Sequence, residues 1–320
     1  MDRNEIYGFM LSVITDMEER GRYSTAHVYR CALNAALVYG GSSLCLEELT
    51  PVWLASYQTY LLKQELLWNT ISTYMRMLRA VYNRAVDAGL VPYIPRQFKG
   101  VFTGRHVNHQ RALEKDEIQK VLSNEAVVVE AEEPAEEAET SLSRRDLRWA
   151  RACLELMLRF HGMPFIDLAN LRKSDLRNGY LTVRRHKTGM PLSVAVDSVA
   201  MKLLRYYANT DSTSPYLLDI LDGNLSGKAA YENYQRVLRL LNLRLSQLSC
   251  RCGIGKRISS YSARHTWATI AKYCGVPVEV ISEALGHASI STTEGYLKQF
   301  DDHKIEKANK VIINYIFKRV

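Results

Sequence analysis

An imidazole and a phenol, His287 and Tyr296, lie near each other at the end of the chain. A short helix over about 278–284 is predicted to end at Gly286, just before His287. Ser291 and Glu294 have the spacing of a capping box, which predicts that a further helix begins there and carries Tyr296. The pattern places both side chains at a corner between helices. The phenol is then either a packing residue or a nucleophile.

A second polar group precedes this corner, in a helix predicted from about Ser260 to Gly275. Tyr261 and Arg264 are three residues apart and share one face of that helix. A guanidinium can donate two parallel hydrogen bonds to an oxyanion, although Arg264 in a salt bridge fits equally well. The apolar stripe expected to face the core consists of Trp267, Ile270, Ala271 and Cys274.

A β-hairpin is predicted in the middle of the chain. Residues 180–184 and 192–196 alternate between apolar and polar side chains, and the turn between them contains Lys187. Taken alone, Lys187 is compatible with a solvated turn. Before the hairpin, a helix predicted over 146–161 is interrupted at Gly162-Met163-Pro164, and another helical turn follows at 167–171.

The first hundred residues predict helices only. Helices are expected over 4–20 and over 24–39 with Ser24 as its cap, then from Thr50-Pro51, and finally between a cap at Asn69 and Gly89. The apolar stripe of the fourth helix is Ile71, Tyr74, Met75, Leu78, Tyr82, Ala85 and Val86. Its opposite face carries Ser72, Arg76, Arg79 and Asn83, which suit phosphates and base edges, but a solvated helix face explains them too.

Charge favours a polyanionic partner. The net charge is +8, and residues 125–139 hold seven glutamates and no other charge, so +8 less −7 leaves +15 for the remainder. Nucleic acid is the natural polyanion, because no basic amphipathic membrane anchor is evident. No apolar run is long enough to span a bilayer and the start is unlike a signal peptide, so we expect a cytoplasmic protein with no membrane partner.

Three further features carry structural expectations. The six scattered cysteines predict free thiols without a zinc site. The basic segment 91–110 is irregular, as an interdomain linker that touches DNA would be. The acidic insertion at about 125–140 predicts either solvated disorder or a DNA mimic, and an amphipathic helix is expected over 305–317.

The order and spacing of Arg264, His287 and Tyr296 resemble the carboxy-terminal signature of tyrosine recombinases, the phage-integrase family. The phrases Ala263-Arg264-His265-Thr266 and Leu285-Gly286-His287 match that pattern, and Lys187 before Thr188-Gly189 resembles the family's lysine on a β-turn. Among members, the chain most resembles integrases and invertases of Bacteroides-type mobile elements.

The resemblance implies a mainly α fold in two domains. Residues 1–104 would form a SAM-like four-helix core-binding domain that clamps DNA, with Arg76, Arg79 and Asn83 as DNA contacts. Residues 105–320 would form an α+β catalytic domain with a small antiparallel sheet and the acidic insertion.

It also implies a site-specific recombinase for integration, excision or inversion that uses neither metal nor any other cofactor. Tyr296 would attack a DNA phosphodiester and form a 3′-phosphotyrosyl link. Arg264 and His287 would bind the phosphate, Lys187 would be the general acid, and Tyr261 takes a position where the family usually has histidine or lysine. The implied partners are double-stranded DNA, a tetramer on two duplexes, and accessory DNA-bending factors at the nucleoid.

One departure leaves alternatives open. The family usually has an arginine where this chain has Pro164, which carries no charge and no donor. One hypothesis is that Arg159, Arg151 or His161 replaces it. The rival is a catalytically impaired member that acts as a DNA-binding or regulatory protein. A helical scaffold with a basic face would explain the charge but not the spacing of Arg264, His287 and Tyr296.

Overall fold

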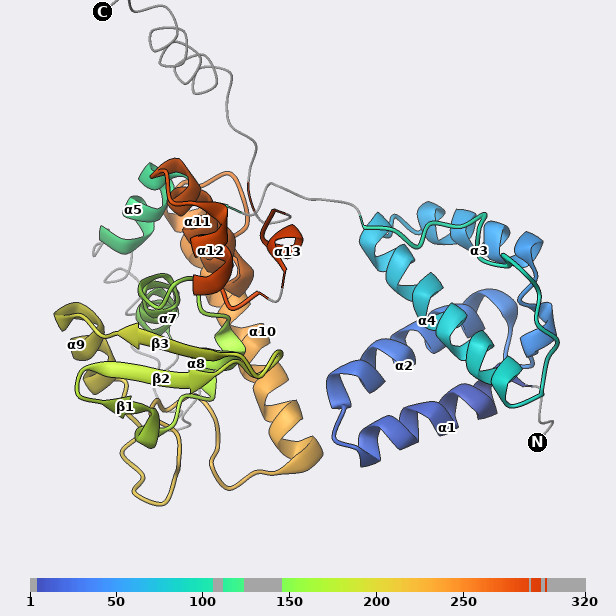
Figure 1. Cartoon of the computed structure of the whole chain (residues 1–320), viewed down its shortest axis with the longest axis horizontal. Coiled ribbons are helices and arrows are strands. Elements are labelled where there is room, and N and C mark those ends of the chain that lie inside the picture. Colours follow the sequence, from blue (N-terminus) through green and yellow to red (C-terminus); the bar gives the residue numbers. More distant parts are fainter. Residues whose placement is uncertain (1–4, 106–111, 124–145, 288, 295–296, 298–320) are drawn as a thin grey trace, which may run out of the picture. The chain divides into compact units, whose positions relative to one another are not determined.

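The computed structural model describes residues 5–105, 112–123, 146–287, 289–294 and 297 (Figure 1). The chain divides into two compact units, one of residues 1–107 with 225–232 and one of residues 108–224 with 233–320. The predicted insertion at 125–140, the predicted helix at 305–317 and Tyr296 lie outside the described residues.

The first unit is helical, as predicted. Its elements are α1 (Ile6–Glu19), α2 (Tyr23–Gly40), the 3-10 turn η1 (Leu46–Glu48), α3 (Pro51–Lys63) and α4 (Trp68–Asp87). Helix α2 packs against both α1 and α4, and fully buried side chains such as Ile14, Ala36 and Leu78 form the core between them. The apolar face of α4 is therefore enclosed by its neighbours.

One of the three predicted caps is confirmed. The hydroxyl oxygen of Thr50 accepts a hydrogen bond from the backbone N–H of Trp53 at 3.2 Å, at the start of α3. Ser24 is wrong as a cap, because α2 already begins at Tyr23 behind Arg22. Asn69 is wrong as well, because the carbonyl of Leu67 accepts from Ile71 N at 3.1 Å and α4 begins at Trp68.

Residues 91–104 contain no helix or strand, as predicted, and they pack along α4. Phe98 and Val101 are buried in the first core, and Tyr82 donates its hydroxyl to Pro92 O at 2.6 Å. Ser72 was predicted on the polar face but is fully buried, because it donates its hydroxyl to Gly104 O at 2.6 Å. Arg76, Arg79 and Asn83 are exposed, as predicted.

The second unit holds a small sheet among helices. Its described helical elements are α5 (Lys115–Ser123), α7 (Leu147–Arg159), α8 (Phe165–Ala169), η2 (Lys173–Asp175), α9 (Ser198–Tyr206), the part of α10 (Gly227–Arg251) from Asn233 onward, α11 (Ser260–Tyr273), α12 (Val278–Ala284) and α13 (Ile290–Glu294). The strands are β1 (Leu176–Arg177), β2 (Tyr180–Arg184) and β3 (Pro191–Ala195). The mainly α fold with a small antiparallel sheet is thus confirmed.

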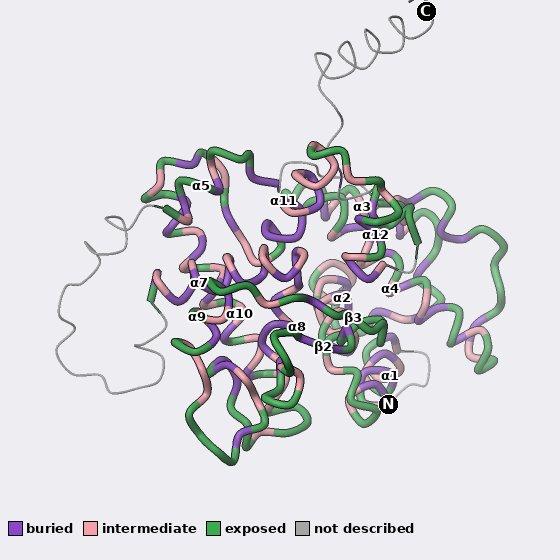
Figure 2. Tube along the Cα trace, turned by 60° about the vertical axis from the view of Figure 1, so that its left-hand side comes forward, coloured by how far each residue is buried: buried purple, intermediate pink, exposed green. Residues whose placement is uncertain are grey.

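The sheet buries one face. Strands β2 and β3 pair antiparallel with Leu181 opposite Val194 and Val183 opposite Leu192, and these four side chains are buried while their neighbours are exposed (Figure 2). Because side chains alternate along a strand, Arg185, two positions beyond Val183, is directed to the same buried face.

The predicted core stripe of α11 is confirmed in part. Trp267, Ile270 and Ala271 are half-buried against the core clusters. Cys274 is exposed, whereas Ala263 and Ala268 are fully buried. The helix packs against α7 and also against α12, so that its buried arc is wider than one stripe and includes Arg264. The capping box expected at Ser291 is also displaced, since α13 already begins at Ile290.

All six cysteines are free thiols, as predicted. Within the described ranges, no helix has the length and apolar character needed to cross a bilayer. The same ranges contain no cluster of three or more histidine, cysteine or acidic side chains able to hold a metal ion.

Candidate active site

Arg264 lies in the first half of α11 with 6% of its surface exposed. Its Nη1 donates to Gly162 O at 3.2 Å, and its Nη2 donates to Leu285 O at 2.6 Å. Nη2 also lies 2.7 Å from His287 Nε2. These contacts hold the guanidinium between the end of α7 and the end of α12.

Gly162 allows this close approach. A Cβ at this position would lie 3.0 Å from Arg264 Cα, and the backbone has a φ of +64° that side-chain-bearing residues rarely adopt. The interruption at Gly162 therefore ends α7 and lets the backbone pass directly over α11.

His287 has one defined tautomer. Arginine has only donors, so His287 Nε2 must accept the hydrogen bond from Arg264. The proton of a neutral imidazole is then on Nδ1, which donates to Thr293 Oγ1 at 2.8 Å. Thr293 is fully buried in α13, so this hydrogen bond orients the ring.

The surroundings of His287 keep it neutral. Burial, together with the positive charges of Arg264, Arg185 and Lys187, lowers its pKa to about 4. A neutral imidazole at pH 7 can accept a proton, and three neighbouring cations favour an anionic ligand.

Lys187 is exposed in the turn between β2 and β3, as predicted. The turn is closed by two backbone hydrogen bonds, from Arg185 N to Met190 O at 2.9 Å and from Gly189 N to Arg185 O at 2.8 Å. Since the charge of Lys187 lowers the pKa of His287, the hairpin brings this lysine to the same site.

Arg185 is the residue that the sequence analysis missed. It is 4% exposed, and its Nη2 donates to Leu285 O at 2.8 Å, the oxygen that also accepts from Arg264. Its Nη1 forms a buried ion pair of 3.0 Å with Asp167 Oδ2. The alternation of the strand could have predicted that Arg185 is buried, because Leu181 and Val183 point inward and Arg185 follows in the same alternation.

Asp167 joins α8 to the hairpin. Its Oδ1 accepts from the backbone N–H of His186 at 2.8 Å, while its Oδ2 pairs with Arg185. Pro164, with a φ of −62°, is the residue from which α8 begins. The proline thus keeps a structural role at the position where a cation was expected.

Two of the three proposed substitutes for that cation lie near α9. Arg159 binds Glu155 at 2.7 Å and Asp197 at 2.6 Å, and Asp197 caps α9. These two ion pairs argue against a role for Arg159 at the Arg264 site. The charge of Arg151 acts on Tyr207 at the end of α9, and its buried Nη1 has no hydrogen-bond partner among the described residues.

The third candidate, His161, does lie near the site. Its ring packs on Trp267 with centroids 5.5 Å apart. Burial and the charge of Arg185 lower its pKa, so His161 is neutral at pH 7 and supplies no positive charge.

The remaining predicted catalytic residues are less well defined. Tyr261 is 46% exposed and its ring lies 5.8 Å from that of His265, whereas Arg264 on the same helix is buried. Tyr296 is outside the described residues, but Leu297 is buried in a cluster with Ala268 of α11 and Leu285.

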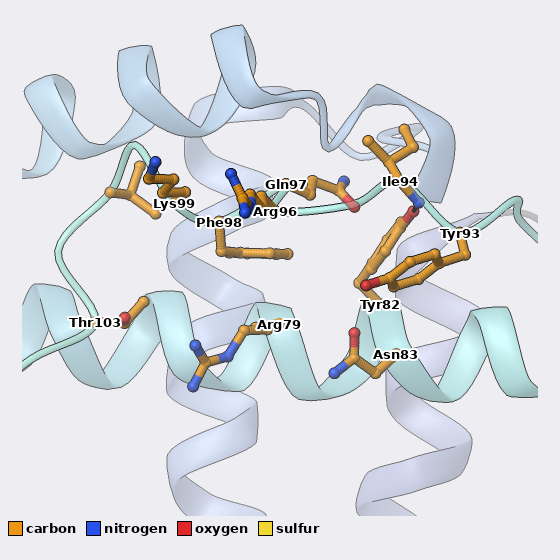
Figure 3. A pocket seen from close by; sticks show the side chains of 11 residues that line it. Arg79, Tyr82, Asn83, Tyr93, Ile94, Arg96, Gln97, Phe98, Lys99 and Thr103 are labelled. Carbon is orange, nitrogen blue, oxygen red and sulfur yellow. Dashed lines mark hydrogen bonds between the residues drawn. The ribbon is translucent and has the colours of Figure 1, made fainter.

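A basic pocket of about 390 Å³ lies in the first unit (Figure 3). Arg79 and Asn83 of α4 line one side, and Arg96 and Lys99 come from the segment that packs along this helix. The lining includes no carboxylate, so the pocket is suited to an anion. Two of the three predicted DNA contacts therefore share one surface, and Arg76 is exposed one turn earlier on α4.

Comparison with known protein families agrees with this arrangement. Residues 129–303, more than half of the chain, match the phage integrase family. The chain belongs to the phage integrase family. Residues 5–100 match the phage integrase SAM-like domain, which accounts for the helical first unit.

Curated relatives of this integrase family member are tyrosine recombinases. One from Pseudothermotoga lettingae is 29% identical over 158 residues, which are 49% of this chain and 52% of the relative. XerA from Pyrococcus furiosus is 28% identical over 160 residues, or 48% of this chain and 53% of XerA. The chain spans about half the length of these relatives.

Solved integrase structures share the fold. A lambda integrase dimer bound to a COC′ core site has a TM-score of 0.65 at 16% identity, covering 93% of this chain and 98% of the other. A lambda integrase tetramer bound to a Holliday junction has a TM-score of 0.63 at 14% identity, covering 94% and 80%. XerH bound to its difH substrate has a TM-score of 0.59 at 17% identity, covering 90% and 79%.

Proposed function

We propose that this protein is a site-specific DNA recombinase that cleaves DNA through a 3′-phosphotyrosyl intermediate on Tyr296. The observation that supports it most is the joining of Arg264 and His287 by a hydrogen bond of 2.7 Å within a cationic site. Membership of the phage integrase family supplies the reaction class.

The proposed chemistry uses each group for one task. The phenol oxygen of Tyr296 bonds to phosphorus and releases its proton to the solvent as the bond to the 5′-oxygen breaks, and Lys187 gives the leaving 5′-oxygen its proton. Arg264 donates to the phosphate oxygens, where negative charge gathers in the transition state. His287 lies beside them in its neutral form, and Tyr261 is the weakest of the assigned residues because it is exposed beside His265.

We propose further that the basic pocket of the first unit contacts the DNA backbone. Arg79 and Lys99 would bind phosphates, and Asn83 would bind a phosphate or a base edge. Arg76 extends this surface along α4. The division into a clamp of residues 1–104 and a catalytic domain of residues 105–320 also remains a proposal.

The proposed partner is double-stranded DNA, with four protomers acting on two duplexes. Relatives of the same fold have been solved as a dimer and as a tetramer on DNA, which supports this assembly. A Bacteroides-type mobile-element origin, accessory DNA-bending factors and a place at the cytoplasmic nucleoid complete the proposal. Inverted repeats that flank the gene would identify the target site.

The decisive experiment incubates the protein with nicked duplexes built from those flanking sequences. A covalent protein–DNA adduct is expected, and Tyr296→Phe should abolish it without weakening DNA binding. Tyr273→Phe on α11 is the matched control and should leave adduct formation unchanged. Tight binding by the unaltered protein with no adduct would rule out the recombinase.

The second candidate is a DNA-binding member of the family with impaired cleavage. Pro164 favours it, because this position supplies no charge to the phosphate. The same assay separates the two, since the impaired member would bind its site and yield no adduct.

A further inference from the structure

The site as built from the sequence lacks one positive charge. A phosphoryl-transfer transition state gathers negative charge on its equatorial oxygens, and a single guanidinium that stabilises it accelerates related reactions by roughly 10³–10⁵. Pro164 supplies none, and Arg159 is bound to two carboxylates. The charge of Arg151 acts on Tyr207 at the end of α9, and His161 is neutral at pH 7. A cation on another element can supply this charge.

Arg185 shares a hydrogen-bond acceptor with Arg264. Both guanidinium groups donate through Nη2 to Leu285 O, at 2.8 Å for Arg185 and 2.6 Å for Arg264. The two Nη2 nitrogens therefore lie beside the same carbonyl oxygen, each within hydrogen-bond distance of it. Arg185 reaches this point from the end of β2, across about a hundred residues of sequence.

One N–H donor of the Arg185 guanidinium has no acceptor among the described residues. Nη1 is bound to Asp167 and Nη2 to the carbonyls of Ala284 and Leu285. Its Nε is buried and has no hydrogen-bond partner among the described residues. An unsatisfied buried donor costs free energy, which is recovered when a ligand accepts from it.

That donor lies next to His287. A Cβ added to Gly286 would lie 3.0 Å from Arg185 Nε, so the glycine leaves room for the guanidinium at the residue directly before His287. The electrostatic influence agrees with this geometry, because the charge of Arg185 lowers the pKa of both His287 and His161.

We propose that Arg185 is the second guanidinium of the phosphate site and replaces the charge missing at Pro164. This inference rests on the proposed recombinase function and extends it. Arg185 takes part in no bond change. It offsets the negative charge on the phosphate while the Tyr296 oxygen bonds to phosphorus and the 5′-oxygen leaves with its proton.

A purely structural role is the competing explanation. The carbonyls of Ala284 and Leu285 lie at the end of α12, where a cation stabilises a helix, and the ion pair with Asp167 ties α8 to the same point. A clamp of this kind would tolerate any change that keeps the fold. The experiment must therefore measure charge at the phosphate.

The variant for this purpose is Arg185→Gln combined with Asp167→Asn, which removes the pair without leaving a buried charge alone. Adduct formation on the nicked duplex should fall about 10²-fold or more, the usual effect of losing one transition-state donor. Arg159→Lys is the matched control and should react like the unaltered protein. Thermal unfolding verifies that each variant folds, and Arg185→Met combined with Asp167→Asn, which also removes the charge, takes the place of the double variant if it does not.

A substrate with a neutral methylphosphonate at the scissile position separates charge from structure. If Arg185 acts on the phosphate charge, the double variant should form the adduct on this substrate at nearly the rate of the unaltered protein. The inference would be overturned if the double variant were slower by the same factor on both substrates, or if it reacted on the normal substrate as fast as the unaltered protein. Pro164→Arg in the double variant should recover part of the rate, because it restores a guanidinium at the family's usual position.

A second arm is independent of catalysis. Titration with inorganic phosphate, followed through the ring NMR signals of His287, should show binding that is about tenfold weaker in the double variant. Equal phosphate affinity in both proteins, or no binding by the unaltered protein, would contradict the inference. If the unaltered protein forms no adduct, the recombinase proposal fails while this titration still decides the role of Arg185.

Discussion

Arg185 and Arg264 donate to the same oxygen, the backbone carbonyl of Leu285, at 2.8 and 2.6 Å. Two guanidinium charges on one acceptor repel each other, and Asp167 brings a full negative charge to the pair. A phosphate placed beside His287 would relieve this repulsion. The charges of Arg185 and Arg264 therefore make this point of the site suited to an anion.

The protonation of His287 gives a first prediction. NMR titration should find its pKa near 4, and Arg264→Gln should raise this pKa while leaving it below 6.5, because burial is the larger cause. Arg239→Gln, an exposed change on α10, is the control and should leave the titration unaltered. A pKa of 6.5 in the unaltered protein would contradict the neutral assignment.

The same pKa predicts how stability depends on pH. The unfolded chain binds a proton at His287 below about pH 6.5, whereas the folded chain binds it only near pH 4. The contribution of His287 to stability is thus complete above pH 6.5 and is lost as the pH falls toward 4. Denaturant unfolding at several pH values should show a smaller decrease over this window in His287→Gln.

Thr293 fixes the tautomer of His287. Thr293→Val keeps the shape but removes the acceptor for Nδ1–H, which should lower the free energy of unfolding by about 1–3 kcal/mol. Adduct formation should fall as well, because the ring loses its orientation. Thr292→Val, an exposed change in the same helix, is the control. Equal stability of the two variants would show that the hydrogen bond is unimportant.

Gly162 is expected to tolerate no side chain. Gly162→Ala combines a φ of +64° with a Cβ only 3.0 Å from Arg264 Cα. Gly179→Ala has a φ of +78° but open space around it, so it isolates the cost of the backbone conformation. Chemical denaturation should show that Gly162→Ala is less stable than Gly179→Ala by about 1–3 kcal/mol of crowding. Similar values would mean that the neighbouring helices give way.

The basic pocket predicts how DNA affinity depends on salt. Arg79→Ala and Lys99→Ala should each weaken DNA binding across sequences and reduce the slope of log K against log salt by about 1. Arg20→Ala is the control, because Arg20 pairs with Asp16 on α1 and does not line the pocket. An unchanged slope would remove these residues from the DNA interface.

Local patterns in the sequence were sufficient for most of the elements. The apolar period of α4, the alternation of β2 and β3, and the Thr50 cap depend on neighbours within one or two turns, and the structure has them as predicted. The limits of such patterns appear at Ser72 and Cys274. Their environments depend on which distant segment covers them. The 91–104 segment covers Ser72, whereas Cys274 is exposed among the described residues.

The sequence by itself determined the family, the helical first unit, the hairpin that carries Lys187, and the order of Arg264, His287 and Tyr296. Only the tertiary structure decided that His287 is neutral and that Arg185 lies beside Arg264. The first depends on burial and on neighbouring positive charges, and the second on hydrogen bonds to Leu285 O from residues far apart in the chain. Spacing along the sequence contains no information about a shared acceptor, because folding alone brings its donors together.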